Sequence, residues 1–420
     1  MRMSLSARTV YLAFCSVSSL LFALCFTAFT LYRVQVVGLS PFELVLVGTL
    51  LELTCFVFEV PTGVLADTRS RRLSVVWGTT LLGLGFMLEG LFPVLSAVLL
   101  AQVVSGIGYT FLSGALEAWI ADESGEETLS SLFIKATTYG QVGGLLGILL
   151  SALLGSFNLQ LPMFVGGLGF LLLTAFLILY MPERHFQPTL TQDRSSWNQM
   201  GDTLKSGLER VRRSPFLKVL MGVALFWGAA SEAYDRLNGA HLLELGFPRS
   251  LLGLEGWTPV MWFSALSVLG MVLGFVTTQL LSRFALERQV WRRVWPLVWA
   301  TLGLALGMLT FALSNSFILA LVGFQVVGLM RLIHGPLSSA FIQHGLESRT
   351  RATVLSLHSQ FDALGQMLGG PLLGLLAARA SLGLALLVGA LLLLPALGLY
   401  LHPALRRGTL EGEEVALELG

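Results

Sequence analysis

The stretch Glu59-Val-Pro-Thr-Gly-Val-Leu-Ala-Asp-Thr-Arg-Ser-Arg-Arg72 joins two long apolar runs, at about residues 42–66 and 73–95. Its charged part is short, and apolar residues resume directly after it. A run of about 20 apolar residues is long enough for an α-helix to span the hydrocarbon core of a bilayer. The stretch therefore predicts a tight polar turn between two membrane-spanning helices, with Gly63 where a neighbouring helix can approach closely.

The composition of the whole chain agrees with this prediction. Of its 420 residues, 55% are hydrophobic and 12% are charged, whereas soluble domains have about 25% charged residues. These values exclude a soluble enzyme and a disordered chain. The net charge of +1 provides no basic field for nucleic acid. The apolar runs are long and unbroken, which excludes a membrane β-barrel with its short alternating strands.

Twelve apolar runs form two groups of six, separated by the most polar stretch of the chain. We therefore predict an all-α membrane protein with twelve transmembrane helices in two six-helix bundles. Similar glycine-rich segments in the two halves, offset by roughly 220 residues, predict a pseudo-two-fold repeat. The expected parts are an N-terminal bundle (1–181), a cytoplasmic linker (182–214) with an amphipathic surface helix over 197–213, a C-terminal bundle (215–402) and a cytoplasmic tail (403–420).

The distribution of Lys and Arg predicts the orientation. With both termini in the cytoplasm, 22 of the 26 basic residues fall on the inner side of the membrane, and Arg331 is counted among them. Cytoplasmic loops of membrane proteins carry such an excess of positive charge. We therefore expect a multi-pass protein of the inner (plasma) membrane with both ends in the cytoplasm.

The opening stretch resembles the signature loop of the major facilitator superfamily, G-x-x-x-D-R-x-G-R-R. The matching positions are Gly63, Asp67, Arg71 and Arg72. The pattern is imperfect, because Thr and Ser occupy positions 68 and 70, where the family has Arg and Gly. The resemblance covers the whole chain and implies a secondary transporter, similar to bacterial drug-efflux proteins, whose two bundles rock around a midplane site.

In that family the loop latches the two bundles together on the cytoplasmic side. The resemblance therefore implies a latch in which Arg71 or Arg72 pairs with Glu117 or Asp122 at the end of the fourth span. The alternative is that these arginines only satisfy membrane topology.

Acidic residues within predicted spans are the candidates for proton coupling, because charges in the membrane are costly to keep. Glu52 and Glu59 are seven residues apart and share one helix face, and so do His358 and Asp362 on the eleventh span. Since Gly63 marks, by resemblance, the seam that faces helix 11, we hypothesise that Glu59 meets the other pair there and titrates during transport. The alternative is a fixed structural pair.

Polar and aromatic residues inside the spans are candidates for lining a substrate cavity: Gln102, Tyr109, Tyr139, Trp227 and Trp262. Many drug–proton antiporters of the superfamily have Arg at the position of Gln102, so proton coupling here would depend on the embedded acids. Four other charged residues are interpreted as solvated groups at the outer rim: Glu89, Glu232, Asp235 and Arg236.

The leading hypothesis is proton-coupled efflux of a small amphipathic solute, cationic or neutral, because embedded acids outnumber embedded bases. Metabolite uptake or facilitated diffusion is the alternative, and a lipid scramblase or a non-transporting sensor on the same fold is an alternative of another class. The sequence has no phosphate-binding loop, H-E-x-x-H or G-x-S-x-G motif. We therefore expect no enzyme activity, no cofactor and no metal. The expected partners are a small-molecule substrate, the lipid bilayer and protons, without nucleic acid, and the protein is expected to be a monomer.

Overall fold

The computed structural model describes residues 5–124, 129–188, 205, 208–209, 211–248, 250–251, 254–284, 294–344 and 348–405. Within these residues, twelve helical segments are long and apolar enough to cross a membrane, so the all-α prediction with twelve spans is confirmed. The described chain also has one short antiparallel hairpin, β1 (Ser250–Leu251) with β2 (Leu254–Glu255). Most of the predicted surface helix over 197–213, and residues 406–420 of the tail, lie outside the described residues.

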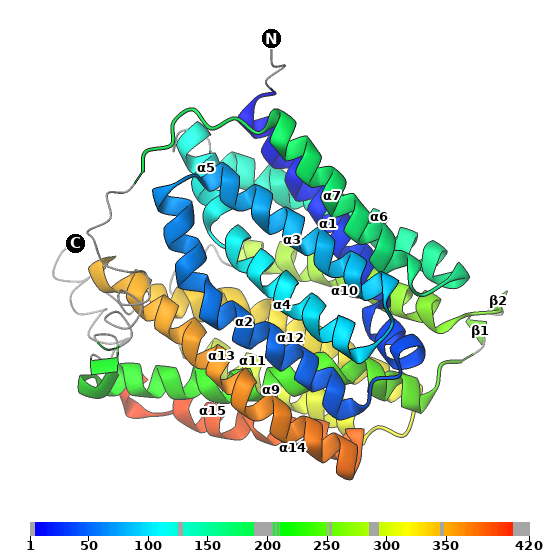
Figure 1. Cartoon of the computed structure of the whole chain (residues 1–420). Helices are drawn as coiled ribbons and strands as arrows, with labels where there is room; N and C mark the ends of the chain where they lie inside the picture. Colours follow the sequence, from blue (N-terminus) through cyan, green and yellow to red (C-terminus); the bar gives the residue numbers. More distant parts are fainter. Residues whose placement is uncertain are drawn as a thin grey trace. The chain divides into compact units, whose positions relative to one another are not determined.

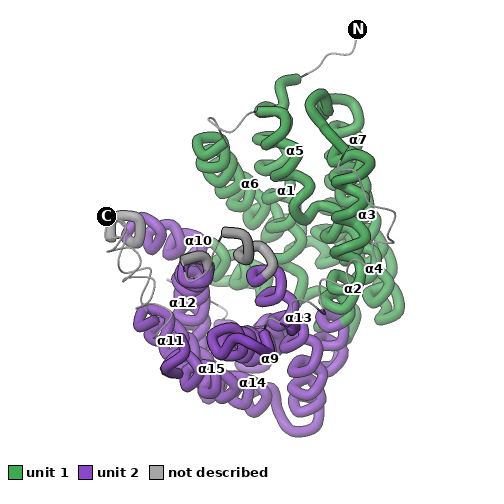
Figure 2. The backbone as a smooth tube through the Cα atoms, turned by 90° about the vertical axis from the view of Figure 1, so that its left-hand side faces the viewer, with its two compact units in different colours: residues 1–39, 50–200, 249–268 green, residues 40–49, 201–248, 269–420 purple. Residues whose placement is uncertain are grey.

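The first compact unit comprises Met1–Leu39, Leu50–Met200 and Arg249–Val268 (Figure 2). Its central helix α1 packs along α6 and α7, and α3 packs along α4 and α7 (Figure 1). The helices of this unit are α1 (Ala7–Tyr32) with the π-helix η1 (Arg33–Val37), α3 (Arg71–Leu91), α4 (Leu95–Leu112), α5 (Ala115–Ser124), α6 (Leu129–Phe157) and α7 (Leu161–Tyr180).

The second compact unit comprises Ser40–Thr49, Gly201–Pro248 and Leu269–Gly420. In it α9 packs along α13, α14 and α15, and α11 packs along α12 and α14, so the pairing of helices repeats that of the first unit. Its helices are α9 (Pro215–Leu245), α11 (Trp295–Leu313), α12 (Phe317–His344), α13 (Ser348–Arg379), α14 (Leu382–Leu391) and α15 (Leu393–Tyr400).

Two further helices, α2 (Pro41–Thr68) and α10 (Pro259–Phe284), contribute residues to both units. Residues 40–49 belong to the second compact unit and residues 249–268 to the first. The sequence boundaries at 181 and 215 stay predictions about domain organisation.

Glycines explain why the same helix pairing occurs twice. A Cβ atom built on Gly143 of α6 would lie 2.1 Å from the carbonyl oxygen of Ser16 on α1, and one built on Gly365 of α13 would lie 2.1 Å from the carbonyl oxygen of Leu225 on α9. The glycines one turn further along, Gly147 and Gly369, make similarly close approaches to the same helices. These small-x-x-x-small faces let the backbones touch, which is how helices associate without a hydrophobic driving force in a bilayer.

Another glycine, Gly114, divides the fourth span. Gly114 has a φ of +71°, a backbone conformation that favours glycine, and it separates α4 from α5. The span therefore continues from Leu95 to Ser124 with a break in the middle. The break brings the side chain of Ser113, at the end of α4, within reach of α2.

The close approach at Gly365 predicts a large effect of one methyl group. We expect Gly365→Ala to destabilise the protein by about 1–3 kcal/mol, because the added Cβ must displace backbone rather than a flexible side chain. Gly328→Ala on α12 is the matched control, since a Cβ there meets no described atom within 4 Å. Thermal unfolding in detergent checks this, and equal melting temperatures of the two variants would contradict it.

Candidate functional site

The charged turn between α2 and α3 ties helix ends of the first unit together. Arg71 at the start of α3 donates one hydrogen bond to the carboxylate of Asp122 and another, of 2.9 Å, to the carbonyl oxygen of Ala118. Its guanidinium also lies 3.8 Å from the carboxylate of Asp67. The structure therefore brings together Asp67, Arg71 and Asp122 of the predicted latch, and the latching role itself stays a prediction.

The other predicted latch residues lie elsewhere. The Arg72 side chain donates to the carbonyl oxygen of Ile178 at 2.6 Å, and its backbone N–H donates to Glu183 at 2.9 Å. Consecutive residues on a helix point about 100° apart, so Arg71 and Arg72 cannot both face α5. Glu117 lies exposed on α5. Of the predicted alternatives, this structure has the pairing of Arg71 with Asp122. Arg72 and Glu117 do not take part in it, and their place in the latch stays a prediction.

Gly63 was also expected to lie against a neighbouring helix. A Cβ at Gly63 meets no described atom within 4 Å, and the expected approach of the eleventh span to Gly63 stays a prediction. The close approaches that the structure shows within each unit are made by glycines on α6 and α13.

Two of the predicted proton-coupling residues, Glu59 and Asp362, have hydrogen-bond partners within their own units. Glu59 is exposed and accepts a hydrogen bond of 3.1 Å from the hydroxyl of Ser113. Glu52, two helical turns earlier on α2, is half-buried. Asp362 accepts a hydrogen bond of 2.8 Å from the amide of Gln366, one turn further along α13. The half-buried His358 lies one turn earlier on the same helix. The expected meeting of Glu59 with His358 and Asp362 stays a prediction.

Glu89 is the centre of a buried network, not a solvated rim residue. Its carboxylate accepts hydrogen bonds of 2.7 and 3.1 Å from Arg33, and both side chains are nearly inaccessible, with exposed fractions of 1% and 3%. The amide of Gln102 donates to the same carboxylate at 3.2 Å, and the hydroxyl of Tyr32 donates to the Glu89 carbonyl oxygen. A buried carboxylate needs such donors. The prediction that Gln102 lines the cavity is therefore wrong, because its side chain is buried and bonded.

Two of the predicted aromatic cavity residues are packing residues. Trp262 is buried at the start of α10 and packs on Trp257, with ring centroids 5.2 Å apart, so its predicted role in lining a cavity is corrected. Tyr109 is half-buried and stacks on Phe22 at 5.8 Å, which places its ring in an aromatic cluster of the first unit. Tyr139 is exposed on α6 and stays a candidate.

The second unit has a polar site that the sequence analysis missed. Arg331 lies in the middle of α12, not on a cytoplasmic loop, and it donates a hydrogen bond to the carboxylate of Asp235 on α9. The guanidinium also lies 3.4 Å from the carbonyl oxygen of Ser231. The side chain of Asp235 is 44% exposed and that of Arg331 is 24% exposed. Charged groups exposed within a membrane span face water or protein rather than lipid.

Aromatic rings surround this ion pair. The Arg331 guanidinium lies 5.1 Å from the ring centroid of Tyr234 and 5.8 Å from that of Trp227. The Trp227 ring in turn stacks on His334 at 4.7 Å. A carboxylate with aromatic faces is the arrangement that binds organic cations. We call Asp235, Arg331, Tyr234 and Trp227 the ion-pair cluster, and Trp227 is the one predicted cavity residue that belongs to it.

A second ion pair on α9 differs from the cluster in its burial. Arg236 donates to Glu232 at 2.9 Å, and the Glu232 side chain is only 1% exposed. A Cβ on Gly48 of α2 would lie 2.0 Å from the Nε atom of Arg236, so the α2 backbone lies directly on this pair. Glu232 and Arg236 are therefore packed groups, and their interpretation as solvated rim residues is wrong.

A family model decides the classification: the model described as Major Facilitator Superfamily matches residues 11–365. The chain belongs to the major facilitator superfamily. This member of the superfamily is therefore a multi-pass membrane protein of a transporter family and not an enzyme.

Individual relatives agree with this classification. The chain is similar to the uncharacterized MFS-type transporter YxaM of Bacillus subtilis (strain 168), with 22% identity over 361 residues that cover 84% of this chain and 86% of YxaM. The solved structure of the nucleoside transporter NupG is similar with a TM-score of 0.76 at 13% identity, covering 94% of this chain and 98% of NupG. A bacterial homologue of the human lysosomal transporter Spinster, in an inward-facing and unoccupied conformation, has a TM-score of 0.75 at 14% identity, covering 97% and 99% of the two chains. These likenesses show the fold that the superfamily members share.

The buried network around Glu89 generates a stability prediction. We expect Glu89→Gln to cost about 3–5 kcal/mol, because it leaves the buried Arg33 guanidinium without its countercharge. Glu255→Gln, which changes an exposed carboxylate, is the control. Thermal unfolding in detergent measures both, and a Glu89→Gln protein that melts with the wild type would show that the pair is not structural.

Proposed function

We propose that this secondary transporter exports a small amphipathic solute, cationic or neutral, in exchange for protons. The observation that supports this most is the half-exposed ion-pair cluster within the spans of the second unit. The proposal includes the orientation expected from the basic residues: an inner-membrane protein, monomeric, with both ends in the cytoplasm.

The cluster supports a cationic or aromatic solute because Arg331 already occupies the position that such a solute would take. Its guanidinium lies between the Asp235 carboxylate and two ring faces. A solute with an organic cation or a flat aromatic group can compete with Arg331 for those same contacts. In this proposal the solute displaces the Arg331 guanidinium from the Asp235 carboxylate and the two rings.

A second embedded acid near the cluster favours cations over anions. A Cβ on Gly228 of α9 would lie 2.0 Å from the carbonyl oxygen of Asp362, so α13 crosses α9 directly beside Trp227. Two carboxylates, those of Asp235 and Asp362, then stand against one guanidinium. An anionic solute would meet net negative charge there.

Proton coupling follows from competition for a carboxylate. A carboxylate that holds a proton no longer attracts a cation, so proton binding and cation binding weaken each other. Asp235 is such a group, and Asp362, Glu59 and Glu52 are further candidates. Because the two ligands compete, protons that enter down their gradient can displace the cation and so drive its export.

The second candidate function is uptake or facilitated diffusion of a neutral metabolite. It is favoured by the aromatic faces of the cluster, which suit a flat ring, and by the likeness to the nucleoside transporter NupG. Transport without proton movement would select it. A scramblase or sensor would move none of the solutes.

Proteoliposomes that contain a pH-sensitive dye test the proposal against a panel of cationic, neutral and anionic amphipathic solutes. We expect solute-triggered proton movement, greatest with the cations. Asp235→Asn removes the charge that both Arg331 and the solute require, so the flux should fall by about tenfold or more. Glu59→Gln tests the further coupling candidate in the first unit.

The control variant is Glu255→Gln, whose exposed carboxylate lies outside the cluster and should leave the flux unchanged. Solute equilibration with no proton movement would replace exchange by facilitated diffusion. Unchanged coupled flux in Asp235→Asn would remove the cluster from the mechanism.

A further inference from the structure

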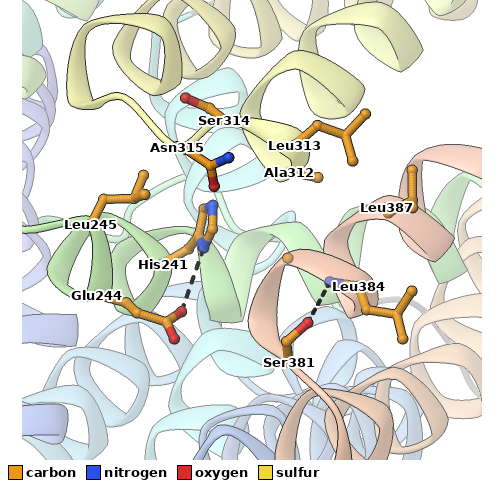
Figure 3. Close-up of a pocket in the computed structure, with 11 residues that line it drawn as sticks. His241, Glu244, Leu245, Ala312, Leu313, Ser314, Asn315, Ser381, Leu384 and Leu387 are labelled. Carbon is orange, nitrogen blue, oxygen red and sulfur yellow. Dashed lines mark hydrogen bonds and ion pairs between the residues drawn. The ribbon is translucent and has the colours of Figure 1, made fainter.

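A separate cavity lies in the second unit, where α9 and α11 end and α14 begins (Figure 3). Its volume is about 530 Å³. His241, Glu244 and Asn315 lie on one side of the cavity, together with Leu245, and Leu313, Leu384 and Leu387 lie on the other, together with Ser381. The cavity therefore offers a polar and an apolar wall to one ligand.

The imidazole of His241 has one satisfied and one unsatisfied nitrogen. Its Nε2 atom lies 3.2 Å from the carbonyl oxygen of Phe311, and the ring packs edge-on against the Phe311 ring at 5.0 Å. A carbonyl oxygen only accepts, so Nε2 carries the proton and Nδ1 of the neutral ring is an acceptor. The side chain is 5% exposed, and its Nδ1 atom is buried without a hydrogen-bond partner among the described residues.

A carboxylate faces that unsatisfied nitrogen. The Oε2 atom of Glu244, one helical turn further along α9, lies 3.8 Å from the His241 Nδ1 atom, which is longer than a hydrogen bond. Figure 3 shows the Glu244 carboxylate directed toward the imidazole of His241, with a dashed line for the contact between them, and Asn315 among the other lining residues. With the ring neutral, Nδ1 and the Glu244 carboxylate are two acceptors that face each other, and a ligand group with several N–H donors can satisfy both. A positive charge on that group would match the carboxylate.

The opposite wall is apolar and open. Leu313 and Leu384 line the cavity and are both exposed large hydrophobic residues at the ends of membrane-spanning helices. An alkyl chain that lies along them would bury apolar surface on both sides. A ligand for this cavity therefore has a cationic donor at one end and an apolar chain at the other.

We propose that this cavity binds a primary ammonium group that carries an apolar chain. Its N–H groups donate to the Glu244 carboxylate and to the Nδ1 atom of His241, and its chain lies along Leu384 and Leu387. A quaternary ammonium has no N–H donor and leaves the histidine unsatisfied. Phosphatidylethanolamine of the bilayer and a free alkylamine share this chemistry. The site is independent of the ion-pair cluster, so it does not rest on the proposed transport function.

The test is a binding titration of the purified full-length protein in detergent, read by native mass spectrometry. The probes are phosphatidylethanolamine, phosphatidylcholine with the same acyl chains, and octylamine. We expect phosphatidylethanolamine to bind about tenfold more tightly than phosphatidylcholine and octylamine to displace it. Glu244→Gln, at an exposed position, should abolish the preference between the two lipids, and Glu255→Gln should keep it.

A second pair of variants tests the cavity without altering charge. Leu384→Trp introduces a bulky ring at the cavity wall and should block binding, whereas Leu391→Trp, at an exposed position at the other end of α14, should not. Binding of octylamine without phosphatidylethanolamine would keep the ammonium site and assign it to a free solute. Equal affinity for the two lipids without binding of octylamine, or an unchanged preference in Glu244→Gln, would overturn the proposal.

Discussion

A charge inside a membrane span must have a partner, and this constraint organises both units of the protein. Removing an ion from water costs several kcal/mol even after relaxation, so an embedded charge persists only when donors or countercharges surround it. Arg33 with Glu89 and Arg236 with Glu232 satisfy this rule in deeply buried sites. The pair of Arg331 and Asp235 satisfies it while remaining half-exposed. Exposure, rather than charge, therefore distinguishes a group that can exchange partners from one that holds helices together.

Close helix packing brings α13 against the helix that carries Asp235. Glycines at positions 365 and 369 let α13 touch the backbone of α9, and the same type of contact joins α6 to α1 in the first unit. That contact brings the backbone of Asp362 against Gly228 of α9. The repeated small residues of the sequence thus produce the same helix pairing in both units, α1 with α6 and α9 with α13. In the second unit this pairing places helices that carry acidic and aromatic residues side by side, although they are distant in the sequence.

The fold was predictable from the sequence because its signal is local: each span is a long apolar run, and the turn with Asp67 and Arg71 carries a family pattern. Most of the candidate site was not, because the partner of an embedded charge lies on another helix. The distribution of basic residues counts Arg331 on the inner side of the membrane, whereas α12 runs from Phe317 to His344 and holds Arg331 in its middle. The hydrogen bond between Gln102 and Glu89 also joins two helices, so neither residue indicates it in the sequence. The cavity at His241 arises only where three helix ends meet.

The proposed exchange requires that Asp235 face a water-filled solute path within the membrane. Accessibility of this position can be measured with Asp235→Cys, in a protein whose Cys15, Cys25 and Cys55 are replaced by Ser, by its reaction with a membrane-impermeant thiol reagent. We expect rapid labelling that slows when a transported cation is present, and little labelling of Glu232→Cys, whose position is buried. An unreactive thiol at position 235, or labelling that no solute of the panel slows, would contradict it.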